Sequence, residues 1–151
     1  MNKIRLGTIG SGVIVHSILD NVRVTPGIRL EAVYSRSREK GDALAKKYGA
    51  SKVYTDMDAF LADEDVNFVY IATPNLLHYP QAKKALLAGK NVLLEKPFCV
   101  TTEEAVEVMR AEKKSGKILS IGFQPRLDEN MQMIKKIVES GVLGKIYYIQ
   151  T

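Results

Sequence analysis

Three consecutive residues, Glu95, Lys96 and Pro97, are the part of the chain best suited to chemistry. They end an apolar run, V-L-L at 92–94, which is typical of a buried strand. Ligands of open α/β sheets bind beyond the carboxyl ends of the strands, and a lysine ammonium there stabilises negative charge on a substrate oxygen. The alternative is that the segment is a charged strand end in solvent. The surrounding elements decide between these two interpretations.

A glycine-rich turn near the N-terminus is the second candidate site. Gly10, Gly12 and Val15 occupy the three positions of G-x-G-x-x-G, between a predicted strand (4–9) and a predicted helix (13–23). The first glycine permits the tight turn, and the second lets the backbone approach a pyrophosphate on the helix N-terminus. Val15 departs from the small residue that is usual at the third position. The strand–turn–helix context favours dinucleotide binding over a merely structural turn.

The residues after the predicted second strand (28–34) indicate which dinucleotide is bound. Sites for NAD place an acid here, but this segment reads S-R-S-R and has no acid. Arg36 can pair with a ribose 2′-phosphate, and Ser35 and Ser37 can donate hydrogen bonds. This pattern favours NADP over NAD. The alternative is that Arg36 and Arg38 are solvated residues at the start of a helix.

Strand and helix signals alternate along the whole chain. Strands are predicted over 4–9, 28–34, 53–54, 67–72, 90–94, 118–121 and 145–150, and helices over 13–23, 38–48, 56–62, 78–88, 101–115 and 128–140. This alternation predicts right-handed β-α-β units and an α/β fold with a doubly wound parallel sheet, the Rossmann fold. The last strand would start a second, α+β domain.

The bulk composition excludes several classes of protein. The chain has 151 residues, 46% of them hydrophobic, and its net charge of +5 is scattered rather than gathered in a stripe that would favour nucleic acid. The single cysteine, Cys99, excludes an internal disulfide and a cysteine metal cluster. No apolar stretch approaches the about 18 residues that span a membrane, and no signal peptide is visible. We therefore expect a cytoplasmic protein with no metal, membrane or nucleic-acid partner.

With its motifs in this order, the chain resembles the glucose–fructose oxidoreductase / inositol dehydrogenase / rhizopine-catabolism (Gfo/Idh/MocA) family of NAD(P)-dependent oxidoreductases. The resemblance covers essentially the whole chain and rests on G-S-G at 10–12, S-R-S at 35–37, I-A-T-P-N-L-L-H at 71–78, A-G-K-N-V-L-L-E-K-P at 88–97, G-F-Q-P-R at 122–126 and G-V-L-G-K-I at 141–146. It implies hydride transfer between nicotinamide and a hydroxyl or carbonyl group of a sugar, cyclitol or related compound.

The resemblance also implies roles for particular residues. Lys96 would be the catalytic residue, touching the reacting oxygen and the nicotinamide ribose, and Arg126 would lie near the site. The implied cofactor-binding residues are Gly10, Ser11, Gly12, Val13, Ile14, Ser35, Arg36, Thr73, Pro74, Asn75, His78, Glu95, Lys96 and Pro97. Alone, a histidine at a helix start, such as His78, is more often a polar cap or a surface residue.

Members of the family are considerably longer than this chain. Their second domain covers the substrate, mediates oligomerisation and typically supplies an Asp and a His to the site. We therefore expect residues 1–122 to be the dinucleotide-binding domain and 123–151 to be a linking helix and the first strand of a truncated second domain. Such a chain would bind the cofactor but be catalytically incomplete, and a homo-oligomer would belong to the full-length protein. The alternatives are a non-catalytic dinucleotide-binding or regulatory module and a methyltransferase.

Overall fold

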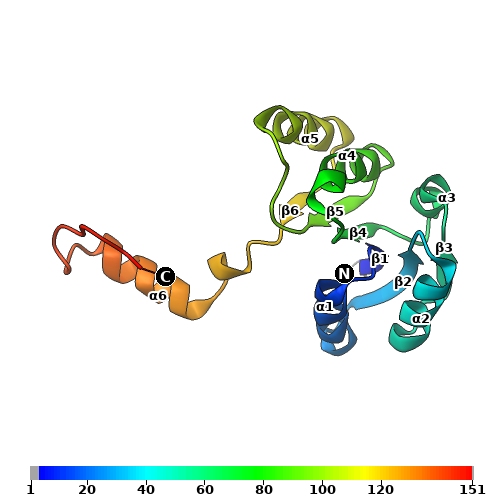
Figure 1. Ribbon diagram of the computed structural model, residues 1–151, viewed down its shortest axis with the longest axis horizontal. Coiled ribbons are helices and arrows are strands. Elements are labelled where there is room, and N and C mark those ends of the chain that lie inside the picture. Colours follow the sequence, from blue (N-terminus) through cyan, green and yellow to red (C-terminus); the bar gives the residue numbers. More distant parts are fainter. Residues whose placement is uncertain (1–3, 151) are drawn as a thin grey trace.

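A six-stranded parallel sheet forms the centre of the protein in the computed structural model, which describes residues 4–150 (Figure 1). Its strands are β1 (Ile4–Ile9), β2 (Ile28–Tyr34), β3 (Lys52–Tyr54), β4 (Phe68–Ile71), β5 (Asn91–Leu94) and β6 (Leu119–Ile121). They lie in the order β3-β2-β1-β4-β5-β6, and every pair is parallel. The chain thus winds outward from β1 in one direction and from β4 in the other, and the predicted Rossmann fold is confirmed.

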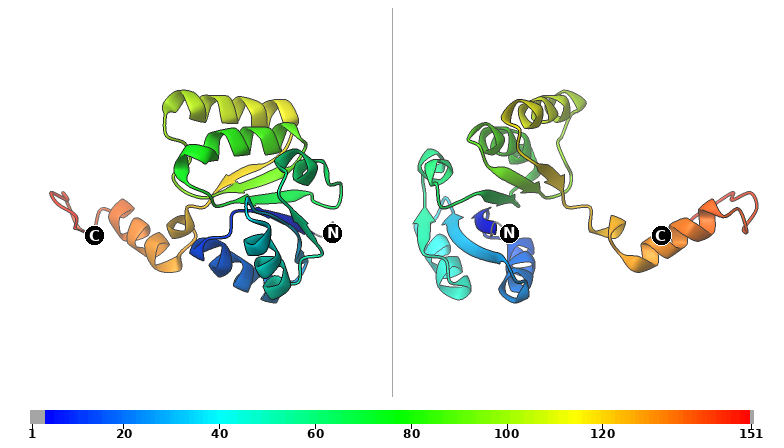
Figure 2. Two further views of the ribbon diagram at one scale, coloured as in Figure 1. Left: turned by 45° about the vertical axis from the view of Figure 1, so that its right-hand side comes forward. Right: turned by 180° about the vertical axis from the view of Figure 1, so that it is seen from behind.

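Helices cover both faces of this sheet (Figure 2). They are α1 (Val13–Val24), α2 (Arg38–Tyr48), α3 (Met57–Ala62), α4 (His78–Leu87), α5 (Thr102–Ser115) and α6 (Glu129–Glu139), with short 3₁₀ turns η1 (Asn75–Leu77) and η2 (Gln124–Arg126). The ends of the six helices and six strands differ from the predicted ones by a single residue at most. Helices α1 and α2 lie on one face, whereas α4 and α5 lie on the other.

Each face of the sheet has its own hydrophobic core. The first core joins α1 and α2 to the sheet through fully buried side chains such as Val15 and Leu19. The second joins α3, α4 and α5 to the sheet through Phe60, Leu86 and Val108. Strands β4 and β5 are apolar at consecutive positions because both of their faces are covered.

Helix ends follow the capping residues in the sequence. Asp56 and Thr101 accept hydrogen bonds from backbone N–H groups in the first turns of α3 and α5. The Thr101 hydroxyl binds the N–H of Glu104 at 3.2 Å, while the Glu104 carboxylate accepts from the N–H of Val100 at 3.0 Å. Helices α3 and α5 therefore begin where local side-chain hydrogen bonds satisfy their free N–H groups.

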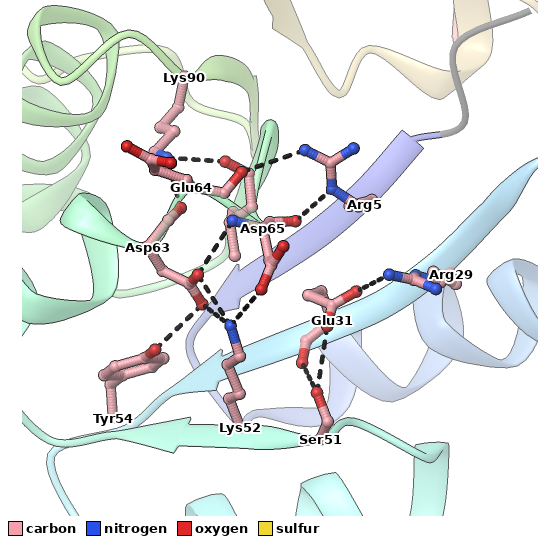
Figure 3. Close-up of polar contacts among 11 residues, drawn as sticks. Arg5, Arg29, Glu31, Ser51, Lys52, Tyr54, Asp63, Glu64, Asp65 and Lys90 are labelled. Atoms are coloured by element: carbon pink, nitrogen blue, oxygen red, sulfur yellow. Dashed lines mark hydrogen bonds and ion pairs between the residues drawn. The ribbon is translucent and has the colours of Figure 1, made fainter.

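A polar network fastens the loop between α3 and β4 at the amino ends of the strands (Figure 3). Lys52 at the start of β3 reaches the carboxylates of Asp63 and Asp65 at 2.9 and 2.7 Å. The Lys90 ammonium, largely buried before β5, donates to the carbonyl oxygens of Asp63 and Val66 at 2.7 Å each. Burial lowers the pKa of Lys90. This network lies at the opposite edge of the sheet from the carboxyl ends and stabilises that edge.

The segment after β6 departs from the sheet. Helix α6 and the residues that follow it extend away from the other helices (Figure 1), and its apolar side chains, such as Met133 and Ile134, are exposed. Residues 145–150, predicted as a seventh strand, form no strand in the described chain. The apolar pattern is there, but a strand needs a neighbour for its backbone hydrogen bonds, and residues 4–150 offer none at this place. None of the helices in the described residues is long and apolar enough to cross a bilayer.

Candidate functional site

The main candidate site is a cleft of about 360 Å³ where the sheet reverses its direction of winding. Its lining comes from the segments that follow β1, β2 and β4. The lining residues are Gly10, Ser11, Gly12, Tyr34, Ser35, Arg36, Ser37, Lys40, Ala72, Thr73, Pro74, Leu77 and Gln81. Beyond the carboxyl ends of β1 and β4, this is the switch point at which doubly wound sheets bind their ligands.

The turn after β1 brings bare backbone to the cleft. Gly10 has a φ of 120°, and a Cβ at this position would lie 2.4 Å from the carbonyl oxygen of Ala72, so only glycine fits. Gly12 caps α1, where a Cβ would meet nothing within 4 Å. No side chain caps α1, and its first turn holds no acid. The free N–H groups and the helix dipole therefore suit an anion such as a pyrophosphate.

The residues after Gly12 divide between solvent and core. Val13 is 88% exposed and Ile14 is 41% exposed, and neither lines the cleft. Val15, which takes the place of the usual small third residue, is fully buried and packs in the core under α1 with Leu19. The core therefore accommodates the Val15 side chain, and the backbone of the turn at Gly10 to Gly12 remains accessible from the cleft.

The segment after β2 forms a polar, acid-free end of the cleft. Arg36 is exposed and lines the cleft, whereas Arg38 pairs with Asp42 at 2.9 Å on the outer surface of α2. The Ser37 hydroxyl caps α2 by accepting from the N–H of Lys40. No carboxylate is among the lining residues of the cleft. This arrangement leaves a guanidinium and hydroxyl groups for a ligand, and no acid that would repel a phosphate.

The segment after β4 forms the opposite wall. The Thr73 hydroxyl donates to Gln81 Oε1 at 2.6 Å, which ties the wall to the first turns of α4. Asn75, in η1, is exposed and lies outside the lining. His78 was predicted to contact the cofactor, but it is 1% exposed, and its ring nitrogens face the carbonyl oxygens of Thr73 and Pro97. Its visible partners are therefore protein groups.

The segment after β5 holds Glu95, Lys96 and Pro97 next to that wall. Glu95 is buried; its carboxylate accepts from the Tyr70 hydroxyl at 2.8 Å and from the Lys96 N–H at 3.3 Å. Lys96 and Pro97 are exposed, and the peptide bond between them is cis. Because β5 lies beside β4 in the sheet, Lys96 shares the ligand edge with the cleft, although it is not among the lining residues.

The structure thus brings together only part of the predicted set. The predicted residues that line the cleft are Gly10, Ser11, Gly12, Ser35, Arg36, Thr73 and Pro74, and those outside its lining are Val13, Ile14, Asn75, His78, Glu95, Lys96 and Pro97. Arg126, in η2 after β6, also lies outside.

Sequence reasoning missed the contribution of Lys40 and Gln81 to the cleft. Each lies in the early turns of the helix that follows a cleft-forming segment, α2 for Lys40 and α4 for Gln81. A search for polar side chains in the first turn of each helix that follows a cleft-forming segment would have found both.

The cleft has an open glycine turn and an uncapped helix N-terminus, and it lies at the switch point of the sheet. Together with the fold, these features define the class of dinucleotide-binding α/β proteins. Within that class, the chain belongs to the Gfo/Idh/MocA family. Its residues 4–123 match the family described as "Oxidoreductase family, NAD-binding Rossmann fold". The resemblance seen in the sequence motifs is thereby confirmed.

Curated relatives of the chain include dehydrogenases that are named for a cyclitol and for a glucoside. Scyllo-inositol 2-dehydrogenase (NADP(+)) of Bacillus subtilis is 35% identical over 88% of this chain and 40% of its own length. D-glucoside 3-dehydrogenase of Escherichia coli is 34% identical over 95% of this chain and 41% of its own length. The chain therefore spans about two fifths of the length of these relatives.

Solved structures with the same fold include complexes with NADP and with NADH. A variant of the 3-ketoreductase KijD10 from Actinomadura kijaniata, in complex with TDP-benzene and NADP, is 27% identical, with a TM-score of 0.89, over 96% of this chain and 46% of that one. The WlbA dehydrogenase from Chromobacterium violaceum, in complex with NADH and UDP-GlcNAcA, is 26% identical, with a TM-score of 0.89, over 97% of this chain and 43% of that one. The family thus includes structures with either cofactor.

Proposed function

We propose that the chain is the dinucleotide-binding part of an NAD(P)-dependent oxidoreductase that acts on a hydroxyl or carbonyl group of a sugar, cyclitol or related compound. The observation that carries this proposal is the combination of an open glycine turn after β1 with a lysine after β5, two strands away in the sheet, at the same carboxyl-end edge. Residues 1–122 would form the binding unit and 123–151 would lead into a second domain. The named relatives support the substrate class.

The cleft would hold NADP in preference to NAD. The backbone of Gly10 to Gly12 and the N-terminus of α1 would hold the pyrophosphate. Arg36 would pair with the 2′-phosphate, and Lys40 adds a second cation to the same end of the cleft. A site for NAD would instead offer a carboxylate to the 2′-hydroxyl, and the cleft lining contains none.

Lys96 would carry the chemistry of the substrate oxygen. A bound nicotinamide supplies the acceptor or donor of the hydride. The exposed Lys96 ammonium would stabilise negative charge on the oxygen as the hydride moves, and Nζ would hold or pass on the proton. The Glu95 carboxylate would not contact the substrate, because it is buried and accepts a hydrogen bond from the Tyr70 hydroxyl.

Calorimetric titration of the 151-residue chain with NADPH, NADH and S-adenosylmethionine tests the cofactor. We expect NADPH to bind most tightly and S-adenosylmethionine not to bind. The change Arg36→Ala should weaken NADPH binding about ten-fold or more, because it removes a charge-assisted hydrogen bond, and should leave NADH binding nearly unchanged. Arg38→Ala is the matched control, since Arg38 pairs with Asp42 outside the cleft. Binding of neither NADPH nor NADH would refute the proposed function.

The second candidate function is a non-catalytic dinucleotide-binding module. One observation favours this candidate: the lining of the cleft contains no His, Asp or Glu that would act as a base. Assays with NADP and a panel of cyclitols and sugars separate the two candidates. Turnover that disappears in Lys96→Met supports an oxidoreductase. Cofactor binding with no substrate-induced NMR shift of the Lys96 amide supports the binding module; a lack of turnover alone does not separate the two, because the chain is expected to be catalytically incomplete.

A further inference from the structure

A buried histidine stands between the two segments that follow β4 and β5. His78 begins α4, where side chains commonly meet solvent, yet it is only 1% exposed. Its Nδ1 lies 2.7 Å from the carbonyl oxygen of Pro97, and its Nε2 lies 2.9 Å from the carbonyl oxygen of Thr73. Both edges of the ring are therefore occupied by backbone groups of different segments.

The chemistry of these contacts makes the imidazole a bridge. A carbonyl oxygen only accepts hydrogen bonds, and a neutral imidazole has a single N–H group to donate. A ring with protons on both nitrogens donates to both carbonyls, whereas a neutral ring donates to one and brings its lone pair against the other. In every protonation state, the ring fills the space between Thr73 and Pro97 and holds at least one of them.

The two bridged residues lie on either side of the proposed reaction centre. Thr73 lines the cleft, while Pro97 directly follows Lys96. On the other side of Lys96, the Glu95 N–H donates to the carbonyl oxygen of Ile71 at 2.9 Å, and the Glu95 carboxylate is bonded to Tyr70. Lys96 is thus held through the residue before it and the residue after it, while remaining exposed itself.

We propose that His78 is a positioning residue that joins the wall of the cleft at Thr73 to the Lys96 segment at Pro97, and so sets where Lys96 stands relative to a bound dinucleotide. The role of Lys96 in this statement rests on the proposed function. The bridge itself does not, because it is made between groups of the protein. His78 acts through backbone carbonyls and does not itself line the cleft, so its loss should be felt most at Lys96 and least at Arg36, which follows β2.

Three variants test this bridge. His78→Phe keeps a planar ring of similar size and removes both nitrogens. His78→Asn places an amide donor near the position of Nδ1, toward Pro97, and His78→Gln places one near Nε2, toward Thr73. Urea unfolding establishes that each variant is folded. If His78→Phe does not fold, the Asn and Gln variants are compared with the unchanged protein instead, because each of them keeps only one hydrogen-bond donor.

Two measurements are made on each variant. The first is amide hydrogen exchange in the ligand-free protein at the Lys96 N–H, with the Gly49 N–H at the end of α2 as the distant reference. The second compares the affinity for NADPH, which spans the site, with that for 2′,5′-ADP, which reaches only the phosphate end. We expect His78→Phe to speed exchange at Lys96 about ten-fold and to weaken NADPH about ten-fold, with 2′,5′-ADP changed less than about two-fold. Either amide variant should recover part of both losses.

Several results would overturn the bridge. They are unchanged exchange at Lys96 in His78→Phe, equal losses for NADPH and 2′,5′-ADP, which a general structural defect would produce, and no recovery in either amide variant. Failure of the unchanged protein to bind both NADPH and NADH would refute the proposed function instead. The exchange measurement would still decide whether His78 holds the Lys96 segment.

Discussion

The hydroxyl of Tyr70 donates a hydrogen bond of 2.8 Å to Oε1 of Glu95, with both side chains buried in the sheet. Burial raises the pKa of Tyr70, and the hydrogen bond to Glu95 acts in the same direction, so the hydroxyl stays a donor throughout the physiological pH range. The other carboxylate oxygen accepts the N–H of Lys96. Glu95 therefore supports the backbone before Lys96 rather than offering its carboxylate to a ligand.

The change Tyr70→Phe tests that support. The change removes the hydroxyl that donates to Oε1 of the buried Glu95 carboxylate. We expect the free energy of unfolding to fall by about 1.5–3 kcal/mol, the usual loss for a hydrogen bond to a charged group. Urea denaturation measures this. Tyr79→Phe is the matched control, because its hydroxyl bonds the half-exposed Glu107, which Lys83 also pairs. Equal losses in the two variants would contradict the special role of the Tyr70 contact.

The two glycines of the first turn should respond differently to the same change. Gly10→Ala forces a Cβ to within 2.4 Å of the Ala72 carbonyl oxygen at a φ of 120°, so both stability and cofactor binding should fall. Gly12→Ala places its Cβ in open space, so stability should hold while the methyl group obstructs a pyrophosphate. Urea denaturation and NADPH titration of both variants give the comparison. A Gly12→Ala protein with undiminished NADPH affinity would contradict the proposed phosphate site.

Local signals explain why so much of the fold is predictable. Helices α2, α3, α5 and α6 each begin after a residue whose side chain caps them, and α1 begins after a glycine turn. Strands β4 and β5 are marked by consecutive apolar residues, as strands covered on both faces require. The switch point follows from the order of these elements, since alternating strands and helices leave few topologies. The glycine turn that lines the cleft was predictable because its signal is itself local.

The features that were not predictable depend on distant partners. The bridge from His78 to Pro97 joins residues far apart in the chain, and no spacing in the sequence announces it. Glu95 belongs to a charged motif, yet its buried bond to Tyr70 makes it a supporting residue. The apolar pattern of 145–150 predicts a strand, but a strand also needs a neighbour, and the described chain supplies none there.

The acid sensitivity of the protein should depend on Asp63, at the edge of the sheet opposite the cleft. Burial alone would raise the pKa of Asp63, but hydrogen bonds from Lys52, from the backbone N–H of Asp65 and from Tyr54 outweigh it and hold this pKa below its usual value. A carboxyl group whose pKa is lower in the folded than in the unfolded state stabilises the fold above its unfolded pKa, about 4. That contribution is lost as the pH falls from about 4 through the folded-state pKa.

Asp63→Asn tests this linkage. The amide cannot ionise, so the variant should be less stable than the unchanged protein at pH 7, and the difference should shrink as the pH is lowered below about 4. Urea denaturation at a series of pH values measures it. Asp42→Asn is the control, because Asp42 is half-exposed and pairs with Arg38 on the surface, where ion pairs contribute little. If the Asp63→Asn difference stayed constant from pH 7 to pH 3, the stabilisation would come from packing of the loop between α3 and β4. If it shrinks while the Asp42→Asn protein parallels the unchanged one, the charge of Asp63 holds that loop against the sheet.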